Sequence, residues 1–239
     1  MTSASDMAGV TQFLDRADVS ERAQAWFDED LAQSGFVMNA SRLWAYQIEA
    51  MDSLFSLMSQ VASARPFTFR ERGILVTACA SALGDSYCSL AWGAKLAAKA
   101  GAQLAAGVLR GDDSALTEAE RAMAAWARRV TSDPNGTSTK DVQELRHAGF
   151  CDADIFAMTV YVALRIALST VNDALGARPD AEYLTLAPAP VRDAVTFGRP
   201  IGASPEPPDS GPSRSGTQAV ERGARPAVVC SDLLNRGYQ

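Results

Sequence analysis

Apolar positions recur with a helical period along most of the first 187 residues of the chain. Between Ser20 and Ser34, for example, Ala23, Trp26 and Phe27 have the spacing that brings side chains to one helix face. The later segments repeat this period, and none shows the period-two alternation of a β-strand. The pattern therefore predicts an all-α protein of about seven helices. We expect them from Ser20 to Ser34, from the turn at residues 35–39 to Arg65-Pro66, from Phe69 to Leu83, from Asp85 to Gly101, from Thr117 through Val130, from Ser138 or Thr139 to Ala148-Gly149, and from about Ala153 to Leu175.

The break between the third and fourth of these helices carries the most specific local signals. Gly84 follows an apolar run and is a natural helix stop, and Asp85 is a favourable N-cap for the next helix. With Asp85 as the cap, Cys88 occupies the third position of the following helix. Trp92 comes four residues later and shares a helix face with Cys88.

Both ends of the chain differ in composition from the helical part. We expect residues 1–18 to form a loose arm, residues 19–187 to form the helical domain, and residues 188–239 to form a tail. Eight of the eleven prolines lie in that tail, among Gly, Ser and Arg. A segment of this kind buries too little apolar surface to offset its ordering entropy, so we expect a largely disordered tail. It could lie over the surface or over a neighbouring subunit as far as Pro200, and its short apolar piece at residues 227–234 could dock elsewhere.

Charge and residue usage exclude several functions. The net charge is −6 with both signs interspersed, which argues against nucleic acid as a partner. The first residues lack a basic and an apolar region of a signal sequence, and no long uncharged apolar run predicts a membrane span, so we expect a cytoplasmic protein without a membrane partner. The four cysteines (Cys79, Cys88, Cys151 and Cys230) show no CxxC pair, and His147 is the single histidine. We therefore expect no disulfide framework, no metal site and no cofactor.

Four motifs resemble one known family in the same order. They are GFVMN at 35–39, RERGILVTACASALGDSYCSLAWG at 70–93, ALTEAERAMAAWARRVT at 115–131 and DVQELRHAGFCDADIF at 141–156. They are similar to motifs of the carboxymuconolactone decarboxylase-like superfamily, in its alkylhydroperoxidase (AhpD)-like, peroxidase-related branch. The resemblance covers residues 19–187. It implies an AhpD-like helical bundle that assembles as a homo-oligomer, a trimer or a hexamer, and acts on a small molecule.

The active-site motif of that family is degenerate in this chain. The peroxidase-like members have a CxxC pair, a histidine four residues after the second cysteine and a glutamate twelve residues before the first. The resemblance implies that Cys88 corresponds to the second cysteine. Asp85 then stands at the first cysteine, Trp92 at the histidine and Gly73 at the glutamate. Asp85 cannot resolve a sulfenic acid, so the two-cysteine mechanism is excluded.

Two interpretations of Cys88 stay open. A helix N-terminus stabilises a thiolate, so Cys88 could reduce a hydroperoxide with an external thiol. Alternatively, Asp85 is only an N-cap and Cys88 a small buried packing residue.

A pocket around this position would include Trp92, Tyr87, Tyr161 and Arg165. Arg165 lies inside the apolar run MTVYVALRIAL, and a buried guanidinium requires a partner. We hypothesise that it pairs with a carboxylate, such as Asp85, close to Cys88. The alternatives are that it extends to solvent or lies at a subunit interface.

The residues therefore leave more than one function class open. One is a peroxidase-like oxidoreductase that uses Cys88 and Asp85 at its active site. The other is a non-redox protein on the same scaffold, either a lyase or decarboxylase-like enzyme or a binder of a small molecule. A purely structural oligomer is a third alternative.

Overall fold

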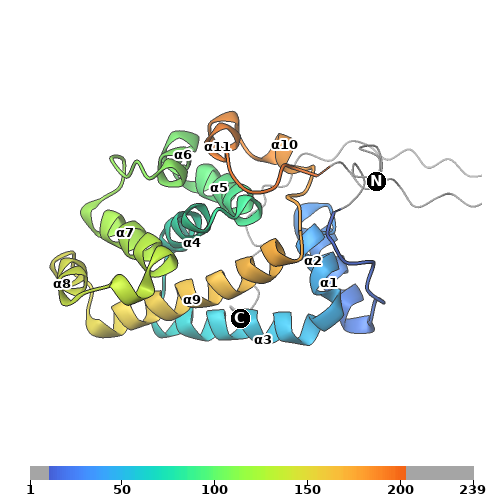
Figure 1. Ribbon diagram of the computed structural model, residues 1–239, viewed down its shortest axis with the longest axis horizontal. Coiled ribbons are helices and arrows are strands. Elements are labelled where there is room, and N and C mark those ends of the chain that lie inside the picture. Colours follow the sequence, from blue (N-terminus) through green and yellow to red (C-terminus); the bar gives the residue numbers. More distant parts are fainter. Residues whose placement is uncertain (1–10, 203–239) are drawn as a thin grey trace, which may run out of the picture.

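The computed structural model describes residues 11–202, and every regular element within that range is a helix (Figure 1). The all-α class expected from the apolar spacing is thereby confirmed. The helices are α1 (Glu21–Ser34), α2 (Asn39–Trp44), α3 (Ile48–Ala64), α4 (Phe69–Leu83), α5 (Ser86–Ala100), α6 (Ala102–Arg110), α7 (Glu118–Ser132), α8 (Thr139–His147), α9 (Asp152–Ala174), α10 (Tyr183–Leu186) and α11 (Ala189–Ala194), with short 3-10 turns at Ala45–Gln47 and Pro134–Gly136.

Local caps place the helix ends close to where the sequence predicts them. The hydroxyl of Thr117 accepts a hydrogen bond from the Glu120 N–H, and the Glu120 carboxylate accepts one from the Thr117 N–H, which begins α7. Gly84 ends α4 at φ +78°, a left-handed conformation that costs glycine little. Asp85 then caps α5. The sharp break between α4 and α5 therefore follows from local chemistry.

Helix α4 lies at the centre of the bundle, where it packs against α5, α7 and α9. Helix α9 runs beside α3 along the opposite side of α4 from α6 and α11 (Figure 1). The completely buried side chains at this centre come from four different helices and bring the helices together: Ile74, Leu75, Leu96, Met123 and Met158. Their burial removes apolar surface from water and is the main stabilising contribution to the bundle.

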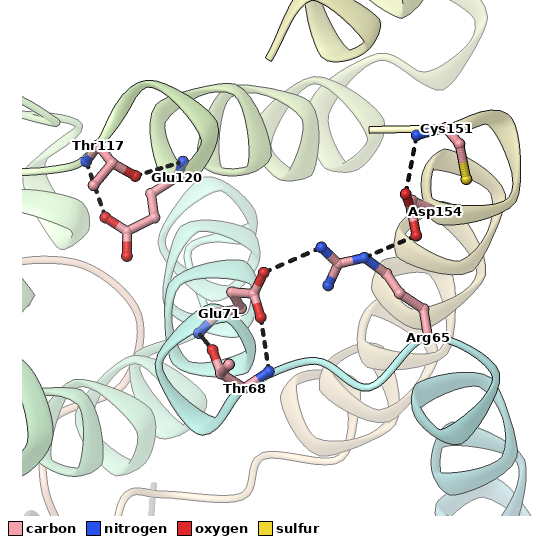
Figure 2. A network of polar contacts seen from close by, with 7 residues as sticks. All are labelled: Arg65, Thr68, Glu71, Thr117, Glu120, Cys151 and Asp154. Carbon is pink, nitrogen blue, oxygen red and sulfur yellow. Dashed lines mark hydrogen bonds and ion pairs between the residues drawn. The ribbon is translucent and has the colours of Figure 1, made fainter. Parts of the chain in front are cut away.

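Arg65 joins the first turns of α4 and α9 (Figure 2). Its Nη2 lies 3.1 Å from Glu71 Oε1, and its Nε donates to Asp154 Oδ1, also at 3.1 Å. Both carboxylates also accept hydrogen bonds from backbone N–H groups, Glu71 from Thr68 and Asp154 from Cys151. One guanidinium thus holds two helix caps in register. We refer to this set as the Arg65 junction.

Several short helices make the described part richer in helices than the seven or so expected. Gly101 (φ +96°) separates α6 from α5, although the alanine-rich sequence on both sides resembles one continuous apolar stretch. The second expected helix is likewise divided into α2 and α3 by a 3-10 turn. Helices of four to nine residues contain too few periods for the apolar spacing to identify them.

The folded part extends beyond residue 187, where the tail was expected to begin. Helix α11 packs against α5 and α6, and Val191 in it is completely buried. A Cβ atom at Gly93 would lie 2.8 Å from Val191 Cγ1, so this glycine on α5 permits the close approach. Residues 188–202 therefore belong to the folded part, with Val191 and Ala194 in its core. The rest of the expected tail, with Cys230 and residues 227–234, lies outside the described residues.

The described part of the N-terminal arm is held against the end of α9. The Phe13 N–H donates to the Leu175 carbonyl at 2.8 Å, and the Arg178 N–H donates to the Thr11 carbonyl at 3.0 Å. The Arg199 guanidinium lies over the Phe13 ring, 4.9 Å from its centroid. Residues 11–18 and the segment around Arg199 thus meet at one end of the bundle.

Helix α9 is long and apolar enough to cross a membrane by length and composition alone. In the structure it packs against α3, α4 and α7 and carries a buried arginine toward the interior. These contacts are those of a core helix in a soluble helical domain.

Candidate functional site

Cys88 lies in the first turn of α5, enclosed by the bundle. Its side chain is only 4 % exposed, and Asp85 before it is completely buried. The Cys88 N–H donates to Asp85 Oδ1 at 2.9 Å, which is the N-cap contact expected from the sequence. The capping role of Asp85 and the position of Cys88 in the first turn of α5 are therefore as expected.

Two side chains of α9 donate hydrogen bonds to the Cys88 sulfur. Arg165 Nη2 lies 3.4 Å from Cys88 Sγ, and Ser169 Oγ lies 3.6 Å from it. The two donors are four residues apart and so share a face of α9. Both distances fit hydrogen bonds to sulfur, and donors of this kind favour the thiolate over the thiol.

The partner of Arg165 differs from the one we hypothesised. Its guanidinium is 2 % exposed, and among the described residues it forms no ion pair with Asp85 or any other carboxylate. The sulfur of Cys88 takes the place of the expected carboxylate, because Asp85 Oδ1 is turned to the backbone N–H of Cys88. The Arg165 Cζ atom also lies 5.5 Å from the centroid of the Trp92 ring.

The groups around Cys88 have opposing effects on the pKa of its thiol. Burial raises the pKa of its thiol well above the ordinary value, and the charge of Asp85 raises it further. The positive charge of Arg165 and the hydroxyl of Ser169 lower the pKa, but they do not overcome the burial. At neutral pH the sulfur is therefore mainly a thiol, and its thiolate fraction grows as the pH rises.

A cavity of about 70 Å³ lies beside the sulfur. Four of the residues expected in a pocket line it: Tyr87, Cys88, Trp92 and Arg165. The wall is largely apolar. The volume is below that of ordinary ligand pockets, about 300 to 1,000 Å³, so the cavity suits a molecule of only a few heavy atoms.

Two expected site residues, Asp85 and Tyr161, are not part of the cavity wall. Asp85 accepts a hydrogen bond from the Cys88 N–H, and the buried Tyr161 packs against Phe67 with 5.8 Å between the ring centroids. Asp85 therefore acts on Cys88 through charge and capping, whereas Tyr161 contributes to the core.

Tyr87 lines the cavity, but its hydroxyl is engaged elsewhere. The hydroxyl donates to Asp180 Oδ2 at 2.7 Å and accepts from the Ala40 N–H at 3.2 Å. Asp180 Oδ1 accepts from the Asn39 N–H at 2.7 Å, and burial raises the pKa of Asp180 to about 7. This buried network joins the start of α2, the start of α5 and the segment before α10.

Sequence reasoning missed several polar residues that line the same cavity, among them Asp30, Lys95 and Asn172. Lys95 could have been found from its helical spacing, because it follows Trp92 by three residues, and its Nζ lies 5.4 Å from the Trp92 ring centroid. Asp30 and Asn172, like Ser169, reach the site only through the packing of α1 and α9, for which the sequence has no local signal.

A wider hollow of about 790 Å³ lies between α1 and α3. It is lined by serines and by the Arg22–Asp52 ion pair, and it contains no cysteine. Within residues 11–202, no three histidine, cysteine or acidic side chains lie close enough together to hold a metal ion. The chemistry of the described residues is therefore concentrated at Cys88 and its smaller cavity.

Solved structures with a similar arrangement of helices include two uncharacterized peroxidase-related proteins. The protein from Ralstonia eutropha JMP134, described as an alkylhydroperoxidase AhpD core, matches with a TM-score of 0.63 and 21% sequence identity over 73% of this chain and 95% of that one. The chain has the fold of the AhpD core. The protein from Silicibacter sp. TM1040 matches with a TM-score of 0.63 and 23% identity over the same shares of the two chains.

The sequence itself matches no protein-family model and no curated protein. The AhpD fold thus rests on the three-dimensional comparison, which agrees with the resemblance inferred from the four motifs. At this level of identity the comparison supports the fold, and the function has to be inferred from the site itself.

Proposed function

We propose that this protein reduces a small peroxide with Cys88 as its single reacting cysteine. The observation that carries this proposal is the pair of donors on Cys88 Sγ, Arg165 and Ser169, at the wall of a small cavity. The AhpD-core fold of peroxidase-related proteins supports it.

The reaction needs no second cysteine at the position of Asp85. The Cys88 thiol loses its proton, and the thiolate attacks the terminal oxygen of the peroxide. The O–O bond breaks, and the leaving alkoxide or hydroxide takes up a proton, which gives a sulfenic acid and an alcohol or water. Two equivalents of an external thiol then reduce the sulfenic acid, and they leave as a disulfide while water is released.

Arg165 has two roles in this scheme. The guanidinium offsets the charge of Asp85 and stabilises the thiolate as it forms. Its remaining N–H groups can donate to a peroxide oxygen on which negative charge develops. Because the pKa of the Cys88 thiol is raised, only a small fraction of the protein carries the reactive thiolate at neutral pH. The oxidation rate should therefore rise by about tenfold per pH unit across neutral pH.

The test is hydroperoxide consumption with dithiothreitol as the reductant. We expect thiol-dependent turnover that increases from pH 7 to pH 9 and is lost in Cys88→Ser. Cys79→Ser is the matched control, because Cys79 is also buried but lies on α4, and it should retain turnover. Turnover that is absent, or that persists in Cys88→Ser, rejects the proposal.

A second candidate function is non-redox binding of a small molecule in the same cavity. The observation that favours it is the raised pKa of Cys88, which keeps the sulfur a thiol at neutral pH. In that case Cys88→Ser would retain ligand binding, and alkylation of Cys88 by iodoacetamide would stay slow up to pH 9. Homo-oligomerisation as a trimer or hexamer stays a prediction, which analytical ultracentrifugation would test.

A further inference from the structure

The Arg165 guanidinium has fewer hydrogen-bond acceptors than its burial requires. A guanidinium has five N–H donors, and a buried charge is costly unless its donors are met. Within the described residues its contacts are the Cys88 sulfur, a weak acceptor, and the Trp92 ring. Its Nε has no hydrogen-bond partner. Arg165 also lines the cavity, so a molecule bound there would lie beside this guanidinium.

Asp85 compensates the charge of Arg165 without satisfying its donors. Asp85 Oδ1 accepts from the Cys88 N–H, and Asp85 Oδ2 has no hydrogen-bond partner in the described part of the chain. The negative charge of Asp85 raises the pKa of the Cys88 thiol and the positive charge of Arg165 lowers it, so both charges act on the sulfur. An acceptor for Arg165 would have to come from the cavity itself.

The charged groups that line the cavity are Arg165, Lys95 and Asp30. Asp30 is completely buried, and its Oδ2 accepts from the Met38 N–H at 3.2 Å. Asp30 thus has a backbone donor of its own, whereas Arg165 has, within residues 11–202, only the weak sulfur acceptor and an Nε without a partner, so the lining favours an anionic acceptor beside Arg165. Both cations lie over the Trp92 ring, with Lys95 Nζ at 5.4 Å and Arg165 Cζ at 5.5 Å from its centroid.

Shape and size narrow the class of anion. A planar guanidinium edge binds a carboxylate through two parallel hydrogen bonds, a geometry that spherical anions cannot match. About 70 Å³ has room for a carboxylate of one or two carbons beside the apolar wall of Ala91, Met51 and Leu168. Larger acids exceed this volume.

We propose that the cavity binds a short-chain carboxylate on Arg165 and that the peroxide which Cys88 reduces is the corresponding peroxy acid. The thiolate attacks the terminal oxygen of the peroxy acid, the O–O bond breaks, and the leaving group departs as a carboxylate. Sulfur becomes a sulfenic acid, and the two electrons of the O–O bond stay with the carboxylate. Arg165 would then hold the leaving group as its charge develops. The substrate assignment rests on the peroxide-reductase proposal, whereas the carboxylate site itself does not.

Binding is tested on the reduced protein without any peroxide. Sodium acetate is titrated against sodium chloride at equal ionic strength, and tryptophan fluorescence is recorded because Trp26 and Trp92 line the cavity. Acetamide, a neutral molecule of the same shape, is the ligand control. We expect a saturable signal with acetate and at least tenfold weaker binding of acetamide. Equal binding of the two molecules, or none of acetate, overturns the site.

Variants locate the binding. Arg165→Gln should weaken acetate binding by at least tenfold, and Arg165→Lys should weaken it less, because lysine keeps the charge but lacks the paired donors. Arg129→Gln is the matched control, since Arg129 lies on α7 with a half-exposed side chain away from the cavity. Unchanged binding in Arg165→Gln refutes the assignment. If circular dichroism shows that this variant is unfolded, the comparison of acetate with acetamide on the unmodified protein decides.

Oxidation of Cys88 in a single turnover tests the substrate class. Peracetic acid should oxidise Cys88 at least tenfold faster than tert-butyl hydroperoxide, relative to the rates of both with free cysteine, and acetate should inhibit competitively. If acetate binds but no peroxide oxidises Cys88, the peroxide-reductase function fails and the carboxylate site stands. If Cys88 is oxidised and acetate neither binds nor inhibits, the present inference fails alone.

Discussion

Two arginines that lie between helices of the core, Arg65 and Arg165, have opposite surroundings. Arg65 bonds to Glu71 and Asp154 and lies over the Phe67 ring at 4.6 Å, so its charge is fully used in joining two helix caps (Figure 2). Arg165 is more deeply buried, yet its hydrogen-bond acceptor is the sulfur of Cys88. A guanidinium with two carboxylates contributes to stability, whereas one that is held beside a thiol and a cavity retains donors for a ligand.

We expect the largest effect on stability when the charge at the Arg65 junction is removed. Arg65→Met loses two ion pairs and loosens two capped helix starts, and it should lower the free energy of unfolding by about 2 kcal/mol. The rate of Cys88 alkylation should not change, because none of these groups contacts the sulfur. Urea unfolding and peptide-mapped alkylation measure the two quantities. A change in Cys88 reactivity in this variant would show that the two arginine environments are coupled.

The pH dependence of stability near neutral pH should arise outside both arginine environments, at Asp180 and in part at Asp173. The pKa of Asp180, about 7 in the folded state, lies above the ordinary 3.8, so folding favours the protonated form. This contribution is complete below the unfolded pKa and is lost as the pH rises through 7, and it should lower stability by about 1–2 kcal/mol between pH 5.5 and 7.5.

Asp180→Asn, which keeps a hydrogen-bonding side chain beside Tyr87, should flatten that slope. Urea unfolding at the two pH values gives the comparison, and Asp141→Asn on the surface of α8 is the control. An unaltered slope in Asp180→Asn would assign the dependence to other groups, such as the half-buried Asp173, whose pKa burial also raises to about 7.

Asp85→Asn removes a negative charge that acts on the Cys88 thiol near Arg165. The asparagine oxygen still caps α5, but the charge that raises the pKa of Cys88 is gone. Alkylation of Cys88 at pH 8 should become about tenfold faster, which corresponds to one pKa unit. Asp85→Ala separates the two effects, because it also removes the cap and costs about 1 kcal/mol of stability. No acceleration in Asp85→Asn would mean that the Asp85 charge does not reach the sulfur.

Ser169→Ala should have the smallest effect. It removes one weak donor to the Cys88 sulfur and leaves Arg165 in place. We expect Cys88 alkylation at pH 8 to slow by about threefold, in line with the lower range for a single hydrogen bond. Thr170→Ala is the matched control on the exposed face of α9, where the Thr170 hydroxyl donates to the Ile166 carbonyl. Equal rates in the two variants would remove Ser169 from the site.

The sequence predicted what local chemistry determines. The stop at Gly84, the cap at Asp85 and the position of Cys88 in the first turn of α5 follow from residues that are neighbours along the chain, and all three occur as expected. Trp92 shares the cavity with Cys88 because both obey the period of one helix. The AhpD-like fold was likewise recognised from four short motifs in order.

Features that depend on packing between distant segments could not be predicted. Arg165 was placed near Cys88, but its contact with the sulfur depends on the rotation of α9 about its axis. Ser169 and Asp30 have no signal of their own, since neither residue type nor spacing links them to α5. The predicted domain boundary at residue 187 lies too early in the chain. The proline-rich composition after it gives no sign that Val191 is completely buried against α5.

The contact between Gly198 and the start of α5 has a practical consequence for shortening the chain. A Cβ atom at Gly198 would lie 2.7 Å from the Gly84 carbonyl oxygen, and the neighbouring Arg199 carbonyl accepts a hydrogen bond from Ser86 Oγ at 2.8 Å. A recombinant version that ends at residue 187, where the composition changes, would uncover the turn that leads into Cys88. Versions made for crystallisation or for labelling should therefore retain the chain through Gly202, and affinity tags belong after that residue.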